Sequence, residues 1–171
     1  KNVCHLVHLP IQSGSTKVLK EMHRRYTKED IFAKVDLIKK YMSDCGITTD
    51  IMVGFPGETE EDFQETLDVV EKVRFSGAFT FVYSRRKGTV ADKMENQIAE
   101  ETKKDRIMRL VDAQNAINRE ESQKYVGKTV QILCEDYDKK RDCYLGRDEY
   151  GKMIYFNHHE FSYHIRFAFK V

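Results

Sequence analysis

The sequence predicts an α/β fold followed by a small all-β module, and three observations support this. From residue 1 to about 83, short apolar segments alternate with amphipathic helical segments, as in parallel strands joined by helices. One long, highly charged helical segment follows, and after it come short alternating segments separated by charged turns. We therefore divide the chain into residues 1–124, part of an α/β barrel or open sheet with a linking helix, and residues 126–171, the β module.

Composition and charge limit the class of protein. The chain has 171 residues, of which 40% are hydrophobic and 33% are charged, as in a globular domain or a domain with a small appendage. No apolar run is long enough to cross a bilayer, and the formal net charge of +1 gives no overall attraction to nucleic acid. The chain starts with Lys1 and has no leader peptide, so we expect a cytoplasmic piece of a longer protein with no membrane contact.

The first strand is expected over residues 3–9, ending before Pro10. The turn QSGS follows, and Ser15 can cap a short helix that runs to about Met22. These elements form the first strand, turn and helix of the α/β part.

Two further helices begin with a T-x-x-D capping pattern, at residues 27–30 and 59–62. The first is expected over about residues 28–44, and strands are expected at residues 47–55 and 78–83. Because strands and helices alternate, the strands should pair in parallel through right-handed crossovers. This amounts to half or less of an α/β barrel, or part of an open sheet.

The remaining sequence predicts a spacer helix and three short strands. The helix covers about residues 100–124, and the strands are expected at residues 129–135, 144–147 and 152–156. The residues expected on the buried side of the helix are Ile107, Leu110, Val111, Gln114 and Ile117.

Two polar turns, QSGS and GFPGET, follow predicted strands of the sheet. Parallel α/β sheets bind ligands at the carboxyl ends of their strands, where backbone groups and helix starts are free. Gly54 and Gly57 permit close approach of a ligand, Pro56 stiffens the turn, and Asp50 offers a carboxylate for hydroxyl groups. The alternative is a tight loop with Asp50 as its cap.

The spacing of the cysteines argues against a metal site built by this chain alone. The four cysteines are Cys4, Cys45, Cys134 and Cys143. They form no C-x-x-C or C-x-x-x-C pair, so we expect reduced thiols rather than ligands of zinc or an iron–sulfur cluster. His5 and His8 could point into a barrel, but a lone histidine is more often structural, and we assign no metal ligand.

Three segments closely resemble the radical S-adenosylmethionine methylthiotransferase family in order and spacing. They are HLPIQSGSTKVLKEMHRRYT, TTDIMVGFPGETEEDF and FTFVYSRRKGT. The resemblance runs from about Cys4 to Phe156. It implies that residues 1–124 are the C-terminal portion of a radical S-adenosylmethionine (β/α) barrel, and that residues 126–171 are a TRAM-like, OB-like module that binds RNA.

The resemblance also implies a set of cofactor-binding residues. They are Gln12, Ser13, Arg24, Asp50, Val82, Tyr83 and Ser84. Gln12 and Asp50 would share the ribose hydroxyls of S-adenosylmethionine, and Arg24 would contact its methionine carboxylate through two charge-assisted hydrogen bonds. Backbone groups of residues 82–84 would lie beside adenine. The alternatives are a solvated helix-end charge for Arg24 and a core side chain for Tyr83.

The activity implied by the resemblance belongs to a longer parent enzyme. That enzyme would add a methylthio group to C2 of N6-isopentenyladenosine at position 37 of tRNA, with S-adenosylmethionine and two [4Fe-4S] clusters as cofactors. The family's C-x-x-x-C-x-x-C motif is absent from this sequence, so we expect the segment to be inactive alone and assign it no catalytic residue. The expected partners are the tRNA anticodon loop and a reductant such as flavodoxin, and the parent is expected to be a monomer.

The β module mixes basic and aromatic residues, as in proteins that combine phosphate contacts with base stacking. The RNA-binding candidates are Lys128, Lys139, Lys140, Arg141 and Arg147. The interleaved aromatic residues are Tyr137, Tyr144, Tyr150, Tyr155 and Phe156. The alternative is that the aromatics form the core and the charges lie in solvated turns. Residues 158–171 depart from the family pattern, which leaves closure of the module open.

Other functions remain open at this point. Within the family, the parent could act on threonylcarbamoyladenosine in tRNA or on an aspartate of a ribosomal protein. The turn HLPIQSGS and the segment VRFSGAFTFVYS favour isopentenyladenosine. From a different class, the chain could be a non-catalytic RNA-binding module.

Overall fold

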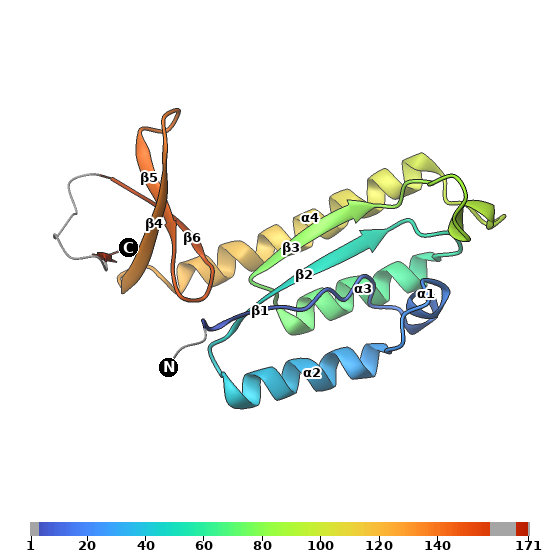
Figure 1. Ribbon diagram of the computed structural model, residues 1–171, viewed down its shortest axis with the longest axis horizontal. Helices are drawn as coiled ribbons and strands as arrows, with labels where there is room; N and C mark the ends of the chain where they lie inside the picture. Colours follow the sequence, from blue (N-terminus) through green and yellow to red (C-terminus); the bar gives the residue numbers. More distant parts are fainter. Residues whose placement is uncertain (1–3, 158–166, 171) are drawn as a thin grey trace.

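A three-stranded parallel sheet forms the centre of the first part of the molecule (Figure 1). The computed structural model describes residues 4–157 and 167–170. The strands are β1 (Leu6–His8), β2 (Gly46–Val53) and β3 (Gly77–Val82), in the order β1-β2-β3. The connecting helices are α1 (Thr16–Glu21), α2 (Lys28–Tyr41) and α3 (Glu60–Val73). The predicted strand–helix alternation is confirmed, although β1 is shorter than expected and α2 ends three residues earlier.

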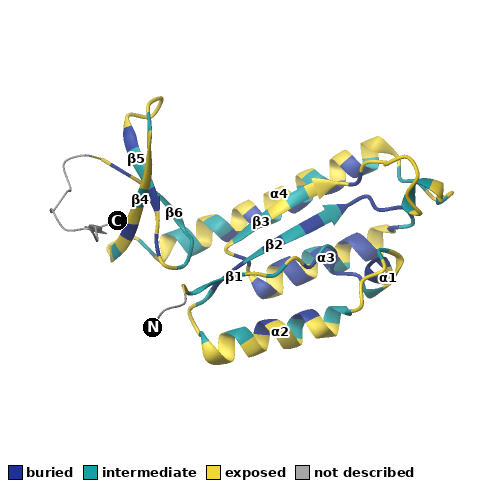
Figure 2. Cartoon of the chain, in the orientation of Figure 1, coloured by how far each residue is buried: buried dark blue, intermediate teal, exposed yellow. Residues whose placement is uncertain are grey.

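The helices cover one face of this sheet and leave the other face open (Figure 2). Alternate residues of β2, such as Ile47 and Ile51, are buried against α2 and α3. On the opposite face Asp50 is half-buried, and the neighbouring strand exposes Phe79 and Phe81. The sheet therefore has one packed side and one accessible side, as expected for part of a barrel wall.

Both predicted T-x-x-D caps are complete capping boxes. The side chains of Thr27 and Thr59 accept the backbone amides of Asp30 and Asp62, and each carboxylate accepts in return from the threonine amide. Ser15 occupies the N-cap of α1, but its side chain makes no cap hydrogen bond. Its hydroxyl donates instead to Asp62 Oδ1 at 2.7 Å, which ties α1 to the start of α3.

A long helix, α4 (Glu100–Gln123), packs along β3 and α3 and leads to the β module (Figure 1). Its 24 residues span about 36 Å at 1.5 Å per residue. A 3-10 turn, η1 (Ala91–Lys93), precedes it. Leu110, Gln114 and Ile117 are buried as predicted, whereas Val111 is exposed because it lies on the solvent side. Lys103 and Arg106, which lie one turn before Ile107 and Leu110 but were not predicted because they are charged, are also buried.

The β module is an antiparallel sheet of four strands. They are β4 (Thr129–Asp138), β5 (Cys143–Arg147), β6 (Met153–Phe156) and β7 (Phe167–Lys170), in the order β6-β5-β4-β7. Ile132 and Phe156 form its buried core. Strand β7 was not predicted, and it pairs with β4 over residues 129–132. The tail that departs from the family pattern thus contributes a fourth strand to the module. Residues 158–166 and 171 lie outside the described residues.

Candidate cofactor site and nucleic-acid interface

The turn after β1 brings Gln12 beside Asp50. The Gln12 amide donates to the Asp50 carbonyl at 2.8 Å, and the Met52 amide donates to the Gln12 carbonyl at 2.8 Å, so the chain extends the sheet by one isolated bridge. Gln12 has a φ of 64°, a left-handed conformation that a non-glycine residue adopts at a cost. Two of the predicted cofactor positions therefore lie on adjacent segments at the carboxyl end of the sheet.

Asp50 belongs to a polar group on the open face of the sheet. His8 Nε2 lies 3.5 Å from Asp50 Oδ2, and His8 Nδ1 lies 3.0 Å from Thr48 Oγ1. Phe79, the partner of Asp50 on β3, contacts the His8 ring edge-on with centroids 6.1 Å apart. The sequence interpretation left His8 unassigned, and pairing of β1 with β2 is the only signal that could have placed it here.

Ser13 uses its side chain inside the fold. Its hydroxyl is buried, lies 3.3 Å from Thr66 Oγ1 and accepts the Ser15 amide at 3.1 Å. The next residue, Gly14, has no room for a side chain, because a Cβ there would lie 2.5 Å from the Thr66 Cα. These contacts fix the turn against α3, and residues 13–15 are buried, so Ser13 supports the turn rather than offering a group to a ligand.

Arg24 is exposed at the end of the α1 turn. Its amide donates to the Leu19 carbonyl at 2.9 Å. Burial raises the pKa of Tyr26 and the charge of Arg24 opposes that rise, which places the guanidinium near the tyrosine. The Tyr26 hydroxyl lies 3.2 Å from the carbonyl oxygens of Pro10 and Ile11, in the segment that leads to Gln12. Arg24 is thus near Tyr26, and its role toward a ligand stays a prediction.

The loop after β2 turns sharply through two glycines with positive φ, Gly54 at 76° and Gly57 at 83°. The Gly54 amide donates to Glu58 Oε2 at 2.7 Å, and Arg106 donates to the same oxygen at 2.8 Å. Glu58 and Arg106 are 3% and 4% exposed, so this is a buried ion pair. Burial raises the pKa of the Glu58 carboxyl, and the hydrogen bonds from Gly54 and Arg106 oppose this rise.

At the end of β3, Tyr83 is buried. The Tyr83 ring is buried edge-on against Phe55, with centroids 5.4 Å apart, and packs near Val18. The structure therefore supports the alternative of a core side chain, while Val82 and Ser84 on either side are exposed. Among the described residues, the buried Tyr83 hydroxyl has no hydrogen-bond partner.

No metal site emerges from residues 4–157 and 167–170. They contain no group of three or more His, Cys, Asp or Glu side chains that could hold a metal ion. All four cysteines are free thiols.

The basic residues of the β module fall into two settings. Lys139, Lys140 and Arg141 lie exposed in the turn between β4 and β5. The Arg141 guanidinium stacks 4.8 Å above the ring of Tyr155. Arg147 lies on the same face of the sheet by register but pairs with Glu135 at 3.2 Å. This face is the strongest nucleic-acid candidate in the module.

The other aromatic residues divide between core and junction. Tyr144 stacks on Phe156 on the core face, with centroids 5.8 Å apart, and Tyr137 packs against Tyr144. Tyr150 points to the α/β part, where its hydroxyl donates to Asp44 Oδ2 at 3.0 Å. Lys128, at the start of the module, is exposed. The alternative of core aromatics thus holds for some of the tyrosines, but not for Tyr155.

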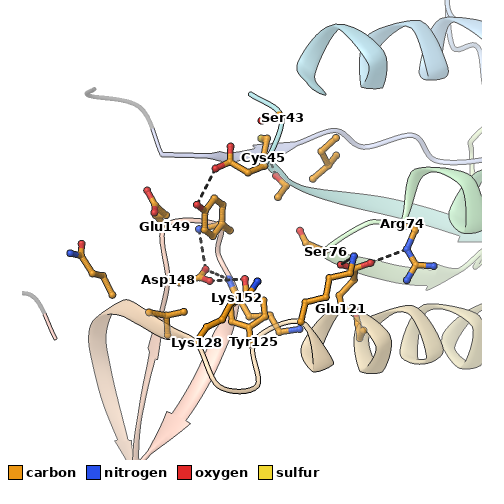
Figure 3. A pocket seen from close by; sticks show the side chains of 18 of the residues that line it. Ser43, Cys45, Arg74, Ser76, Glu121, Tyr125, Lys128, Asp148, Glu149 and Lys152 are labelled. Atoms are coloured by element: carbon orange, nitrogen blue, oxygen red, sulfur yellow. Dashed lines mark hydrogen bonds and ion pairs between the residues drawn. The ribbon is translucent and has the colours of Figure 1, made fainter. Parts of the chain in front are cut away.

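A large cleft lies elsewhere, between the amino ends of β2 and β3 and the β module (Figure 3). It has a volume of about 730 Å³. Many of its polar groups form hydrogen bonds with one another. Tyr125 donates to Asp148 at 2.8 Å, and Lys152 donates to Ser122 at 2.8 Å. Burial lowers the pKa of Lys152. We still expect the cofactor site at the carboxyl ends of the strands rather than in this cleft, because ligands of parallel sheets bind at those ends.

Comparison with known proteins supports the α/β fold described above. Residues 1–70 match the model of the Radical SAM superfamily. Coproporphyrinogen III oxidase (HemN) from Escherichia coli, a radical SAM enzyme, has a similar fold with a TM-score of 0.57 at 15% identity, covering 85% of this chain and 41% of that chain. The first 70 residues and the fold thus resemble the radical SAM superfamily, whose name implies S-adenosylmethionine and an iron–sulfur cluster as cofactors.

Within the superfamily, the chain is similar to proteins named tRNA-2-methylthio-N(6)-dimethylallyladenosine synthase. It is 51% identical to the Acetivibrio thermocellus protein over 157 residues, 49% to the Caldicellulosiruptor saccharolyticus protein over 154 and 48% to the Fusobacterium nucleatum protein over 157. These alignments cover 90–91% of the chain. The chain spans about a third of the length of these relatives, 33%, 33% and 36%. No helix in the described part is both long and apolar enough to cross a membrane.

Proposed function

We propose that this chain is the C-terminal segment of a methylthiotransferase that adds a methylthio group to C2 of N6-isopentenyladenosine at position 37 of tRNA. The observation that carries the proposal is the 51% identity to a protein named for this nucleoside, maintained over 157 residues. The aligned length is too great to lie in the α/β part alone, so the similarity extends into the β module.

In this proposal Gln12 and Asp50 hold the ribose of S-adenosylmethionine. Their donor and acceptor groups suit two vicinal hydroxyls, and the backbone hydrogen bonds between the two positions support their cooperation. Arg24 suits the methionine carboxylate, and the exposed backbone on either side of Tyr83 suits the adenine edge. When bound, S-adenosylmethionine and a reduced cluster would supply the radical and the methyl group. The role of these residues is to bind S-adenosylmethionine and to orient it.

The cluster ligands are proposed to lie in a part of the parent protein outside this chain. We propose two [4Fe-4S] clusters and a flavodoxin-like reductant for a monomeric cytoplasmic parent. The β module would hold the anticodon loop, with Arg141 and Tyr155 as a stacking platform and neighbouring lysines on phosphates. The described antiparallel sheet is consistent with a TRAM-like module.

The test is mass spectrometry of tRNA nucleosides from cells that lack the parent gene. Loss of the 2-methylthio derivative and accumulation of isopentenyladenosine are expected. The wild-type gene and an Asp36→Asn control should restore the modification, because Asp36 is exposed on α2. An Asp50→Asn gene should fail to restore it. Unchanged levels of the 2-methylthio derivative in the deletion strain would refute the proposal.

The same experiment separates the remaining alternatives. Loss of the methylthio group from threonylcarbamoyladenosine, or of a modified aspartate from a ribosomal protein, would assign the chain to another branch of the family. Restoration of a lost modification by the Asp50→Asn gene would reject the role proposed for Asp50.

A further inference from the structure

The first turns of α4 hold both strand ends of the proposed cofactor site. They lie outside residues 1–70, the part that matches the superfamily model. Lys103 and Arg106 are 3% and 4% exposed, although lysine and arginine are almost never fully buried unless they are paired. Their burial therefore needs an explanation in their contacts.

Arg106 acts on the loop after β2 through Glu58. It donates to Glu58 Oε2 at 2.8 Å and to the Glu58 carbonyl at 3.1 Å, and the same Oε2 accepts the Gly54 amide at 2.7 Å. Gly54 is the first residue after β2 and has a positive φ. The conformation of the loop at the end of the strand that carries Asp50 is thus fixed from α4.

Lys103 acts on the same loop and on the end of β3. A Cβ on Gly54 would lie 2.4 Å from Lys103 Cγ, so the lysine stem packs directly on the glycine. The Lys103 ammonium lies 5.5 Å from the centroid of the Tyr83 ring and 2.8 Å from Glu100. One helical turn therefore touches both segments that are proposed to receive the ribose and the adenine.

We propose that Glu58, Lys103 and Arg106 are positioning residues for S-adenosylmethionine, through which α4 holds residues 54–57 and the end of β3 in the conformation that receives the adenosine. The proposal rests on the function proposed above. A buried ion pair is often no more stabilising than apolar residues of the same volume, so stability alone does not explain it. A loop fixed before binding loses less conformational freedom when the ligand binds, which increases affinity.

Two variants of the ion pair separate positioning from stability. In the double variant Glu58→Leu, Arg106→Met, apolar side chains replace both charges, so the melting temperature should stay within about 3 °C of the parental value. Because the Gly54 amide loses its acceptor, the Kd for S-adenosylmethionine should rise about tenfold or more. In the single variant Glu58→Gln, the amide oxygen can still accept from Gly54, so the Kd should change less than about threefold. The melting temperature should fall, because only Glu60, 3.5 Å from Arg106 Nε, then carries a charge opposite to the buried Arg106.

The measurements use the full-length parent protein loaded with its cluster, with S-adenosylmethionine titrated calorimetrically. The matched control is Arg74→Met, Glu121→Leu, an ion pair of 2.9 Å toward the other end of α4, which should not alter the Kd. Hydrogen exchange of the Gly54 amide gives a readout independent of ligand. It should be at least about tenfold faster in the double variant than in the parent and unchanged in the control.

Lys103→Met tests the second contact, because methionine keeps the apolar stem on Gly54 and removes the charge over Tyr83. It should raise the Kd with little loss of stability. If the double variant binds with parental affinity, or if affinity simply follows melting temperature across all variants, the positioning role is wrong. If the parental protein itself does not bind S-adenosylmethionine, the proposed function fails instead.

Discussion

The two ends of the parallel sheet differ in how their polar groups are paired. At the amino end, facing the β module, the cleft is large, but its acids are paired with hydroxyl groups and cations, as in the Asp44–Tyr150 and Asp148–Tyr125 contacts. At the carboxyl end, the loop after β2 is held from α4 by the buried ion pair of Glu58 and Arg106. The polar groups of the amino end thus bind one another, whereas the loop at the carboxyl end is fixed from outside, and we expect the ligand there.

The strongest test of this difference replaces one acid at each end of β2. Asp50→Ala in the parent protein should weaken S-adenosylmethionine binding by about 100-fold, because charge-assisted hydrogen bonds to the ribose are lost, with little change in melting temperature. Asp44→Ala, at the amino end, should leave that affinity unchanged. Calorimetric titration of both variants with S-adenosylmethionine measures the two changes in affinity. Equal changes in the two variants would show that the two ends do not differ in cofactor binding.

A second test asks whether the β module serves RNA rather than the cofactor. Reversal of Lys139, Lys140 and Arg141 to Glu should weaken tRNA binding and flatten its salt dependence by up to about two units, at ~0.7 for each lost single-strand phosphate contact. The control is the same change to Glu at Lys34 and Lys40, which are exposed on α2. Parental affinity and slope in the triple variant would place the RNA elsewhere.

A third test concerns the packing that supports the carboxyl end. Burial alone would raise the pKa of Asp62, but hydrogen bonds from Lys17, Thr59 and Ser15 outweigh it and lower the pKa to about 2. The native state therefore binds this proton less tightly than the unfolded chain, whose pKa is near the ordinary 3.8. About 2 kcal/mol of stability should be present above pH 4 and disappear as the pH falls through about 2.

Chemical denaturation across this pH range measures the effect. In Asp62→Asn the acid-dependent part of the unfolding free energy should shrink by that amount, whereas Asp36→Asn should leave it unchanged. A parallel pH profile for Asp62→Asn and the parent would show that Asp62 is not the titrating group.

The smallest expected effect lies at the amino end. The Tyr150 hydroxyl donates to Asp44, and burial together with this hydrogen bond raises the tyrosine pKa to about 12. Tyr150→Phe removes one hydrogen bond between the α/β part and the β module, which should cost about 0.5–1 kcal/mol of unfolding free energy. S-adenosylmethionine affinity should not change, and a change would show that this junction communicates with the cofactor site.

Local signals explain what the sequence could predict. The capping boxes at Thr27 and Thr59 involve residues three positions apart, and the apolar periods of α2 and α3 need no knowledge of partners. Asp50 was predicted from its place at the end of a strand and Gln12 through the resemblance, and only pairing across 38 residues brings them together. That kind of contact has no signature in a single segment.

The missed features depend on distant partners. Arg106 lies one helical turn before Leu110 on the buried face, but a charged side chain gives no sign of burial by itself, and its partner Glu58 is 48 residues earlier. Ser15 was predicted to cap α1, but Asp62 offers its hydroxyl a charged acceptor. Strand β7 was missed because its pairing with β4 is determined across the module rather than within its own four residues.

The central claim is that S-adenosylmethionine binds at the carboxyl ends of the strands. Hydrogen exchange of the cluster-loaded parent protein, with and without S-adenosylmethionine, tests this most directly. The account predicts new protection at residues 11–14, 50–57 and 82–84, and none at residues 43–46 or 121–131, which include most of the cleft beside the β module. Protection confined to that cleft, with residues 50–57 unchanged, would contradict it.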